Sequence, residues 1–183
     1  MKEMIKKVEE WSRVRRLDTA DPKAQALKVI EEFTEMMMAK KEYEVAKNLN
    51  WTKDAPKELK DKVIDGVGDT YVTLIILCQQ LRKSFEGVYK GCAAQLSTEN
   101  GIKAINELAT GISKGHISTT VKQAVVNMVE IADGVSFGIG EYPKDCLEVA
   151  YNEIKDRKGM MIHGSFVKYD DLSPVDKAVL DGD

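Results

Sequence analysis

The sequence predicts an all-α fold, and three observations support this prediction. Only four prolines occur among the 183 residues, so long stretches lack the residue that most strongly breaks a helix. Within these stretches apolar residues recur at steps of three and four positions, the spacing of one face of an α-helix. Strict alternation of apolar and polar residues, typical of half-buried strands, is scarce. We therefore expect a helical bundle that forms a single domain over residues 1–183.

Two long helices are predicted in the first part of the chain, residues 1–84. The pair Asp21–Pro22 is typical of an N-cap followed by proline at the first helical position, and this helix should run to about Asn48. Residues 54–56 give a similar start for the next helix. The positions expected to pack against the bundle alternate steps of four and three: Val63, Val67, Thr70, Leu74, Leu77 and Leu81.

Residues 85–140 are poorer in charge and richer in glycine than the rest of the chain. Two shorter helices are predicted there, at about 98–112 and 117–135, with a turn at 113–116. Together they are expected to form a second two-helix unit packed against the first.

The two units also resemble each other in sequence. Residues 28–35 resemble residues 103–110, and residues 63–69 can be placed over residues 121–127, where amides replace the acids. We interpret 85–140 as a degenerate second copy of the first unit. Chance similarity between amphipathic helices is the alternative.

The C-terminal part is predicted to be a helix followed by a small hairpin. The helix should begin at Pro143 and end near Gly159. Residues 160–172 are too short and mixed for a further helix, so an extended hairpin around residues 163–164 is expected there, and the last ten residues are expected to form a loose tail.

Composition excludes several classes of function. With 27 basic and 30 acidic residues the net charge is −3, so the chain as a whole does not attract nucleic acid or an anionic membrane. The three cysteines, Cys78, Cys92 and Cys146, are too few and too widely spaced for a disulfide framework or a structural zinc site. The longest apolar run is far too short to span a membrane. We expect a cytoplasmic protein without a nucleic-acid or membrane partner.

Acidic residues are the main indication of chemistry. Glu31, Glu32 and Glu35 fall within about one helical turn, and Asp65 and Asp69 stand four apart just before an apolar run. Ionised carboxylates near a core are costly unless a cation compensates them, and oxygen ligands without His or Cys favour Mg²⁺ or Mn²⁺. A solvated helix face is the alternative for the three glutamates. Two aspartates placed among glycines inside a helix argue against it, since aspartate is a poor helix former.

Taken in order, three segments resemble the MazG-like nucleotide pyrophosphohydrolases, most closely the small phage-type members. They are Glu31-Glu32-x-x-Glu35, Asp65-x-x-x-Asp69 and Asn152-x-x-Lys155-x-Arg157-Lys158. The similarity extends to Trp11 and Phe166 and leaves residues 85–140 largely outside it. The resemblance implies an all-α enzyme that uses Mg²⁺ to hydrolyse nucleoside triphosphates, with deoxynucleoside triphosphates the expected substrates, to a monophosphate and pyrophosphate. A phage-encoded member would work in the host cytoplasm.

The resemblance also implies roles for the acids. Glu32, Glu35 and Asp69 would hold the metal, and Glu31 would be a further ligand or would orient water. The family usually has a glutamate three residues before the position of Asp69, and this chain has Gly66 there. We expect Asp65, one residue earlier, to supply the missing ligand.

By the same resemblance, basic and amide groups are expected to bind the substrate. Lys155, Arg157 and Lys158 would contact phosphates, and Asn152 would contact sugar or phosphate. A solvated helix end is the alternative, because cations favour helix C-termini anyway. Gln25 and Lys28 precede the glutamates on the same helix and could reach base or phosphate, although ordinary surface polarity explains them almost as well.

Other functions remain open at this point. The substrate could be a modified or signalling nucleotide, or the protein could be a non-catalytic helical interaction bundle. Residues 111–122 have the outline of a helix-turn-helix, but too few basic residues for a phosphate-binding surface. A homodimer is possible, with residues 160–168 as an arm across the partner.

Overall fold

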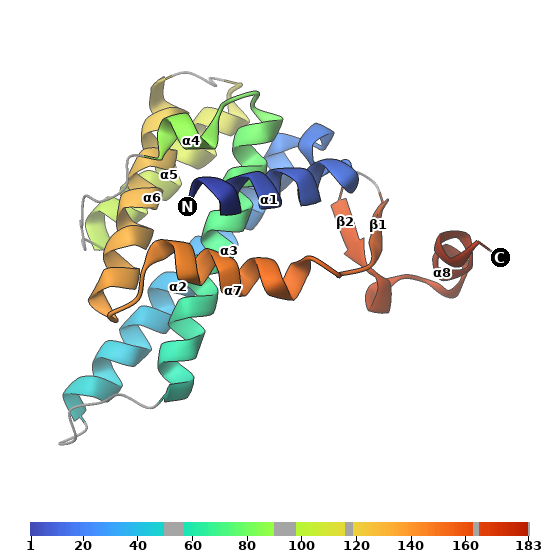
Figure 1. The fold of residues 1–183 in the computed structure, drawn as a ribbon. Helices are drawn as coiled ribbons and strands as arrows, with labels where there is room; N and C mark the ends of the chain where they lie inside the picture. The colour runs from blue at the N-terminus through green and yellow to red at the C-terminus, as the bar shows by residue number, and fades with distance from the viewer. Residues whose placement is uncertain (50–56, 90–97, 116–118, 163–164, 183) are drawn as a thin grey trace.

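The computed structural model describes residues 1–49, 57–89, 98–115, 119–162 and 165–182, and in them the all-α prediction is confirmed (Figure 1). The α-helices are α1 Lys2–Val14, α2 Pro22–Leu49, α3 Lys57–Gln80, α4 Phe85–Val88, α5 Thr98–Ser113, α6 Thr119–Gly138, α7 Pro143–Ile154 and α8 Pro174–Asp181. Two short 3₁₀ helices, η1 Leu17–Thr19 and η2 Tyr169–Asp171, and the strands β1 Gly159–Ile162 and β2 Ser165–Lys168 complete the described elements.

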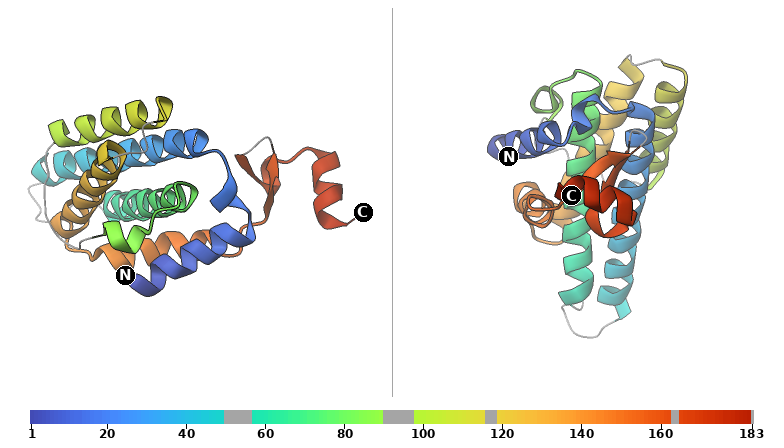
Figure 2. Two further views of the ribbon diagram at one scale, coloured as in Figure 1. Left: turned by 90° about the horizontal axis from the view of Figure 1, so that it is seen from above. Right: turned by 90° about the vertical axis from the view of Figure 1, so that its right-hand side faces the viewer.

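Two helix pairs form the body of the fold. Helix α2 packs along α3, α5 packs along α6, and the pairs meet through contacts of α2 with α5 and of α3 with α6. The left view of Figure 2 looks along α3 and shows it surrounded by α1, α2, α6 and α7, all of which contact it. The predicted packing of two two-helix units is therefore present. Whether they arose by duplication stays a prediction.

The predicted packing positions of α3 are buried, as the three- and four-residue spacing indicated. Val63, Val67, Leu74 and Leu77 are fully inaccessible, as is Thr70. Such burial removes a continuous apolar stripe from water, which is the main favourable term in folding. Helix α3 thus serves as the central element against which the other helices are placed.

Two glycines let neighbouring helices approach α3 unusually closely. A Cβ at Gly66 would lie 2.9 Å from Met36 Cα on α2, and a Cβ at Gly68 would lie 2.4 Å from the Cys146 carbonyl oxygen on α7. Side chains of any size are excluded at both positions. The glycines flanking Val67 therefore bring α2 and α7 close to α3 on two sides, beside Asp65 and Asp69.

A hydrogen bond joins the two helix pairs inside the core. The Tyr71 hydroxyl on α3 donates to the Asp133 carboxylate on α6, and both residues are buried. The pKa of Tyr71 is raised well above its usual value, first by burial and then by the charge of Asp133. This contact fixes α6 against α3, because a buried carboxylate must keep its hydrogen-bond donor.

The boundaries of the predicted helices follow the sequence closely, α1 and α4 were not predicted, and two further differences lie at the C-terminal end. Helix α7 ends at Ile154 and not near Gly159, because Gly159 already begins β1. The last ten residues are not a loose tail over their whole length, since α8 forms there: Ser173 accepts a hydrogen bond from the Asp176 backbone N–H, and Pro174 occupies the first turn. This start signal was present in the sequence.

The predicted hairpin is confirmed. β1 and β2 pair antiparallel with Gly159 opposite Lys168 and Ile162 opposite Ser165. The hairpin and α8 project to one side of the helices (Figure 1).

Some predicted features lie outside the described residues. These are the helix start at 54–56, the end of the 113–116 turn, part of the 111–122 segment, the hairpin turn at 163–164, and Cys92. Cys78 and Cys146 are described, and both are buried free thiols. Within the described ranges, none of the helices has both the length and the apolar character needed to cross a lipid bilayer.

Candidate active site

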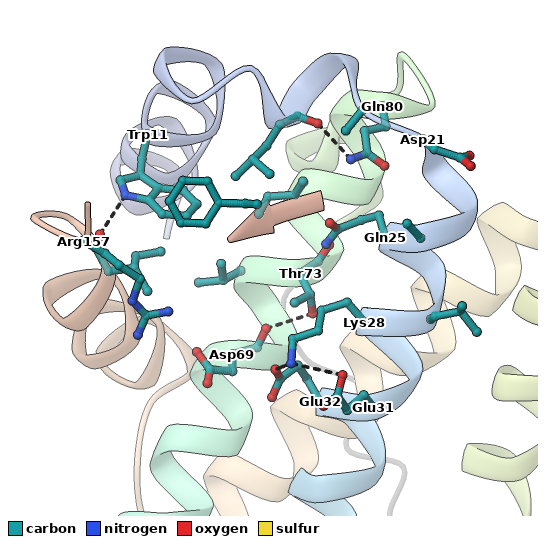
Figure 3. Close-up of a pocket in the computed structure, with 18 of the residues that line it drawn as sticks. Trp11, Asp21, Gln25, Lys28, Glu31, Glu32, Asp69, Thr73, Gln80 and Arg157 are labelled. Atoms are coloured by element: carbon teal, nitrogen blue, oxygen red, sulfur yellow. Dashed lines mark hydrogen bonds and ion pairs between the residues drawn. The ribbon is translucent and has the colours of Figure 1, made fainter. Parts of the chain in front are cut away.

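A cavity of about 420 Å³ lies between α1, α2, α3, the end of α7 and β2 (Figure 3). One part of its wall is acidic, with Glu31, Glu32 and Asp69. The opposite part is apolar and aromatic: Trp11, Leu17, Val72, Ile76, Ile154 and Phe166. The cavity therefore joins a charged end to an apolar end in one continuous space.

Lysine 28 lies against the glutamates of the acidic end. Its ammonium group is 2.7 Å from Glu32 Oε1 and 3.1 Å from Glu31 Oε2 (Figure 3). Glu32 is 9% exposed, so this pairing compensates a nearly buried charge. Because α2 is helical here, positions 28, 31 and 32 fall on one face.

Next to the cavity, α2 and α3 form a smaller hollow of about 250 Å³ that is also acidic. Glu32, Glu35, Asp65 and Asp69 line it. The five predicted metal ligands thus line the hollow or the cavity, and Glu32 and Asp69 line both. Glu31 lines only the larger cavity.

The close packing at Gly66 leaves no room for a side chain. A side chain at this position would run into the α2 backbone at Met36. Asp65 instead lines the acidic hollow, as the sequence argument required of the replacement ligand. Its role in binding metal stays a prediction.

The carboxylates that line the hollow between α2 and α3 are not fully compensated by nearby positive charge. Burial raises the pKa of Asp69 to about 7, and the neighbouring charges of Asp65, Glu32 and Glu153 add to the effect, whereas Arg157 opposes it. Burial and the charge of Glu153 also raise the pKa of Asp65. In addition, Asp65 Oδ1 is buried without a hydrogen-bond partner. A bound cation would relieve all of these costs.

The donor set fits Mg²⁺ or Mn²⁺, since it consists of carboxylate oxygens without His or Cys. The side chains are not gathered tightly enough to hold an ion as they stand. In the part of the chain that the structure describes, no three His, Cys, Asp or Glu side chains form a group able to hold a metal. Binding would therefore require the carboxylates to turn toward one another and Lys28 to leave Glu32.

Arginine 157 reaches the cavity because α1 holds the end of α7. The indole Nε1 of Trp11 donates to the Ile154 carbonyl at 2.8 Å, and Arg15 Nη2 donates to the Arg157 carbonyl at 2.9 Å and the Lys155 carbonyl at 3.2 Å. These bonds tie α1 to the last residue of α7 and to the segment that follows it, where the Ile154 carbonyl also accepts from the Arg157 backbone N–H. They fix the backbone from which the guanidinium of Arg157 extends into the cavity (Figure 3).

Three predicted substrate ligands do not line the cavity. Asn152 on α7 and Lys155 directly after it are both exposed, and Lys155 Nζ donates to Asn152 Oδ1 at 3.1 Å. Lys158 lines a separate hollow beside Arg15 and Arg16. Of the six predicted substrate-binding residues, only Gln25, Lys28 and Arg157 line the cavity.

Other residues near the site had been given no role from the sequence. Glu153 acts electrostatically on Asp65 and Asp69 from α7, and its spacing of four from Arg157 is the one signal that could have indicated it. Trp11 and Phe166, whose ring centroids are 6.1 Å apart, were named from the sequence only as part of the family resemblance and were assigned no role. Their long separation in the chain gave no sign that they meet.

Searches with this chain among protein-family models, curated proteins and solved structures find no match in any of the three. The site must therefore be interpreted from its own geometry.

Proposed function

We propose that the protein hydrolyses nucleoside triphosphates, with deoxynucleoside triphosphates the expected substrates, to a monophosphate and pyrophosphate with the help of Mg²⁺. The observation that carries this proposal is the cavity itself, which has carboxylates at one end, aromatic and aliphatic side chains at the other, and cationic side chains in its wall. A nucleotide bound to metal is complementary to this arrangement, because the cation would face the carboxylates, the cationic side chains would face the phosphates, and the flat base would face the apolar wall. Its phosphates would lie at the acidic end and its base at the apolar end.

The apolar end suits a base because its walls are held in place. Trp11 is fixed by its hydrogen bond to Ile154 and packs edge to face with Phe166. Flat aromatic rings of a ligand gain both burial and favourable ring contacts in such surroundings.

The acidic end would hold the metal through Glu32, Glu35, Asp65 and Asp69. Bound there, Mg²⁺ screens the phosphate charge and makes water a better nucleophile at neutral pH. Glu31 is the carboxylate best suited to orient water, since it lines the cavity and not the hollow between α2 and α3. Lys28, once released from Glu32, and Arg157 provide positive charge for the phosphates.

In the proposed reaction the oxygen of water attacks the α-phosphorus, the proton that the water loses passes to the Glu31 carboxylate and on to solvent, and the bond from this phosphorus to the α–β bridging oxygen breaks. Pyrophosphate leaves with the electron pair of that bond. Negative charge builds up on the leaving group, so the fixed positive charge of Arg157 would stabilise the transition state.

The test is pyrophosphate release from a panel of ribo- and deoxyribonucleoside triphosphates, with and without Mg²⁺. Glu35→Gln and Asp69→Asn should each abolish release, because each removes a charged ligand oxygen. Glu44→Gln is the matched control: Glu44 lies on the same helix, pairs with Lys40 at 3.1 Å and lines neither the cavity nor the hollow. This variant should keep full activity.

Two results would contradict the proposal. One is the absence of release from every nucleotide, together with a melting temperature that Mg²⁺ does not change, which would favour a non-catalytic interaction bundle. The other is release that persists in Asp69→Asn. Release only from a modified or signalling nucleotide would replace the substrate and keep the reaction.

A further inference from the structure

We propose that the protein has a second ligand site, beside the cavity, that binds a nucleoside monophosphate. The site is a hollow of about 630 Å³ whose basic lining residues are Arg15, Arg16, Arg157 and Lys158, and we call it the basic hollow. It lies where the end of α1, the segment after α7, the hairpin and α8 come together, on the side of the molecule to which the hairpin projects (Figure 1). The inference does not depend on the proposed hydrolysis, because it concerns binding at a different place.

The positive charge of the basic hollow is not compensated by the protein. Its wall has four basic side chains and two acidic ones, Asp156 and Asp181, which leaves an excess of two positive charges, although the chain as a whole has a net charge of −3. Within the described ranges, none of the four basic side chains forms an ion pair. Asp181 accepts a hydrogen bond from the Tyr169 hydroxyl at 2.5 Å. An anionic ligand would supply the missing negative charge.

Arg15 is held in position by neutral groups. Its guanidinium carbon lies 4.6 Å from the centroid of the Trp11 ring, and its Nη2 donates to the backbone carbonyls of Lys155 and Arg157. These partners orient the guanidinium without cancelling its charge. A fixed guanidinium loses little freedom when it binds an anion, and its planar N–H groups suit phosphate oxygens.

Arg16 contributes a second guanidinium from an unusual backbone position. It directly follows the C-cap of α1 and has φ 58° and ψ 22°, in the left-handed region. Glycine is the residue that adopts this conformation at least cost after a helix. The backbone therefore gives no reason for a long cationic side chain here, whereas a ligand at the basic hollow does.

The rest of the wall is apolar, which indicates the kind of anion. Val14, Met160, Met161, Phe166 and Leu180 line it, and Val14 and Leu180 are 70% and 38% exposed. A ligand that covers these side chains removes apolar surface from water. Thioethers and the phenyl ring also make favourable contacts with a flat aromatic ring. A phosphate joined to a nucleobase thus suits the basic hollow better than inorganic phosphate or a phosphate with an aliphatic chain, and the volume is that of a small-molecule site.

The test is binding of AMP in the absence of Mg²⁺, measured by calorimetry with EDTA present. The cavity has more acidic than basic side chains in its wall, so without metal it disfavours phosphate and the basic hollow is the expected place of binding. We expect one AMP per chain, with an affinity that falls at higher salt. Arg16→Gln and Lys158→Gln should each weaken binding at least about fivefold, because each removes a charged partner of the phosphate.

Arg13→Gln and Lys155→Gln are the matched controls. Each changes a residue of the same type, three positions before its counterpart, and neither Arg13 nor Lys155 lines the cavity or the basic hollow. Both variants should bind AMP as tightly as the unaltered protein. All four substituted side chains are exposed, and thermal melting checks that each variant is folded.

Two further probes test the apolar wall. Inorganic phosphate has no apolar part, and hexyl phosphate replaces the nucleoside by an aliphatic chain, so AMP should bind at least about fivefold more tightly than either. Leu180→Asn should weaken binding of AMP and leave binding of inorganic phosphate unchanged. Its control is Val175→Asn, since Val175 lies on the same helix, is 72% exposed and does not line the basic hollow.

Several results would overturn the inference. No binding of AMP, or an affinity that stays the same in Arg16→Gln or in Lys158→Gln, would remove the site. Weaker binding in Lys28→Gln would place AMP in the cavity instead, because Lys28 lines the cavity and not the basic hollow. Hexyl phosphate that binds as tightly as AMP would exclude a nucleotide as the ligand. Since these measurements involve no turnover, a failure of the proposed hydrolysis would leave them unaffected.

Discussion

The two helix pairs resemble each other in arrangement and differ in where they carry charge. In α2, Lys28 lies 2.7 Å from Glu32; at the aligned positions of α5, Lys103 lies 3.9 Å from Glu107. Only the first of these lysine–glutamate pairs lines a cavity that also holds carboxylates from the next helix. The same local spacing is thus part of a candidate site in the first pair. In the second pair it is a long contact between an exposed lysine and a half-buried glutamate, whose Oε2 is buried without a hydrogen-bond partner.

The difference in charge between the two helix pairs is larger for α3 and α6. At the positions aligned with Asp65 and Asp69, α6 has Gln123 and Asn127, whose side chains form a hydrogen bond of 2.8 Å with each other. These amides cost little, because they are neutral and paired. The aspartates, in contrast, have raised pKa values and one buried oxygen without a partner. A packed helix pair therefore does not need these acids, and a ligand is the simplest reason to carry them.

The largest expected effect is on the rate of pyrophosphate release, and it compares a glutamate of the first helix pair with the aligned glutamate of the second. Glu32→Gln should lower pyrophosphate release by about a hundredfold to a thousandfold, since it removes a charged group from the reacting end of the cavity. Glu107→Gln changes the aligned residue of α5 and should leave the rate unchanged. Steady-state kinetics at saturating Mg²⁺ measures both, and equal losses in the two variants would remove the functional distinction between the pairs.

Glycines provide a comparison of packing. Gly68→Ala should destabilise the protein by about 3 kcal/mol, because the new Cβ would press on the Cys146 carbonyl oxygen at 2.4 Å. Gly101→Ala in α5 would bring its Cβ only into ordinary contact with the Phe33 ring at 3.5 Å and Met37 Cε at 3.8 Å, so it should be neutral or stabilising by up to about 1 kcal/mol. Urea unfolding of both variants measures the difference. A harmless Gly68→Ala would contradict the close approach of α7 to α3.

The raised pKa of Asp69 predicts how stability depends on pH without metal. An acid whose pKa rises from 3.8 to about 7 on folding binds its proton more tightly in the folded state, so stability is lost as pH rises through this interval. Between pH 5 and pH 8 the loss should be roughly 2 kcal/mol, reduced by solvent screening because Asp69 is only partly buried.

Asp69→Asn is the variant that checks this dependence. It should flatten the pH profile of the melting temperature and raise stability at pH 8, and Mg²⁺ should stabilise the unaltered protein more at pH 8 than at pH 5. Asn127→Ala, at the aligned position of α6, should retain the pH dependence. A profile that rises from pH 5 to pH 8 without metal would show that Asp69 is ionised at little cost.

The smallest effect concerns the lysine of the second pair. The side chain of Lys103 is 67% exposed and 3.9 Å from Glu107, so Lys103→Ala should change the free energy of unfolding by no more than about 0.5 kcal/mol. Calorimetric titration should also show unchanged Mg²⁺ binding. Lys28→Ala, by comparison, should strengthen Mg²⁺ binding in the absence of nucleotide, because the lysine competes with the ion for Glu32. Identical behaviour of the two variants would count against a metal site at α2.

Much of the fold could be predicted from local sequence. Start signals such as Asp21–Pro22, and the three- and four-residue spacing of apolar residues in α3, depend only on neighbours within a few turns. The gathering of Glu31, Glu32 and Glu35 on one helix is local in the same way. Two predictions were wrong. The helix after Pro143 ends earlier than predicted, because the chain turns into the hairpin, and α8 forms where a loose tail was predicted, because Ser173 caps a new helix there.

The sequence by itself determined helices α2, α3, α5 and α6, the start of α7, the hairpin and the identity of the candidate carboxylates, since each depends on periodicity or on residue type. Tertiary structure alone decided which groups meet. It placed Trp11 beside Phe166, used α1 to direct Arg157 into the cavity, and left Asn152 and Lys155 in solvent. The physical reason is that burial, desolvation and hydrogen-bond orientation depend on how helices far apart in the chain approach one another, here as closely as Gly66 and Gly68 allow.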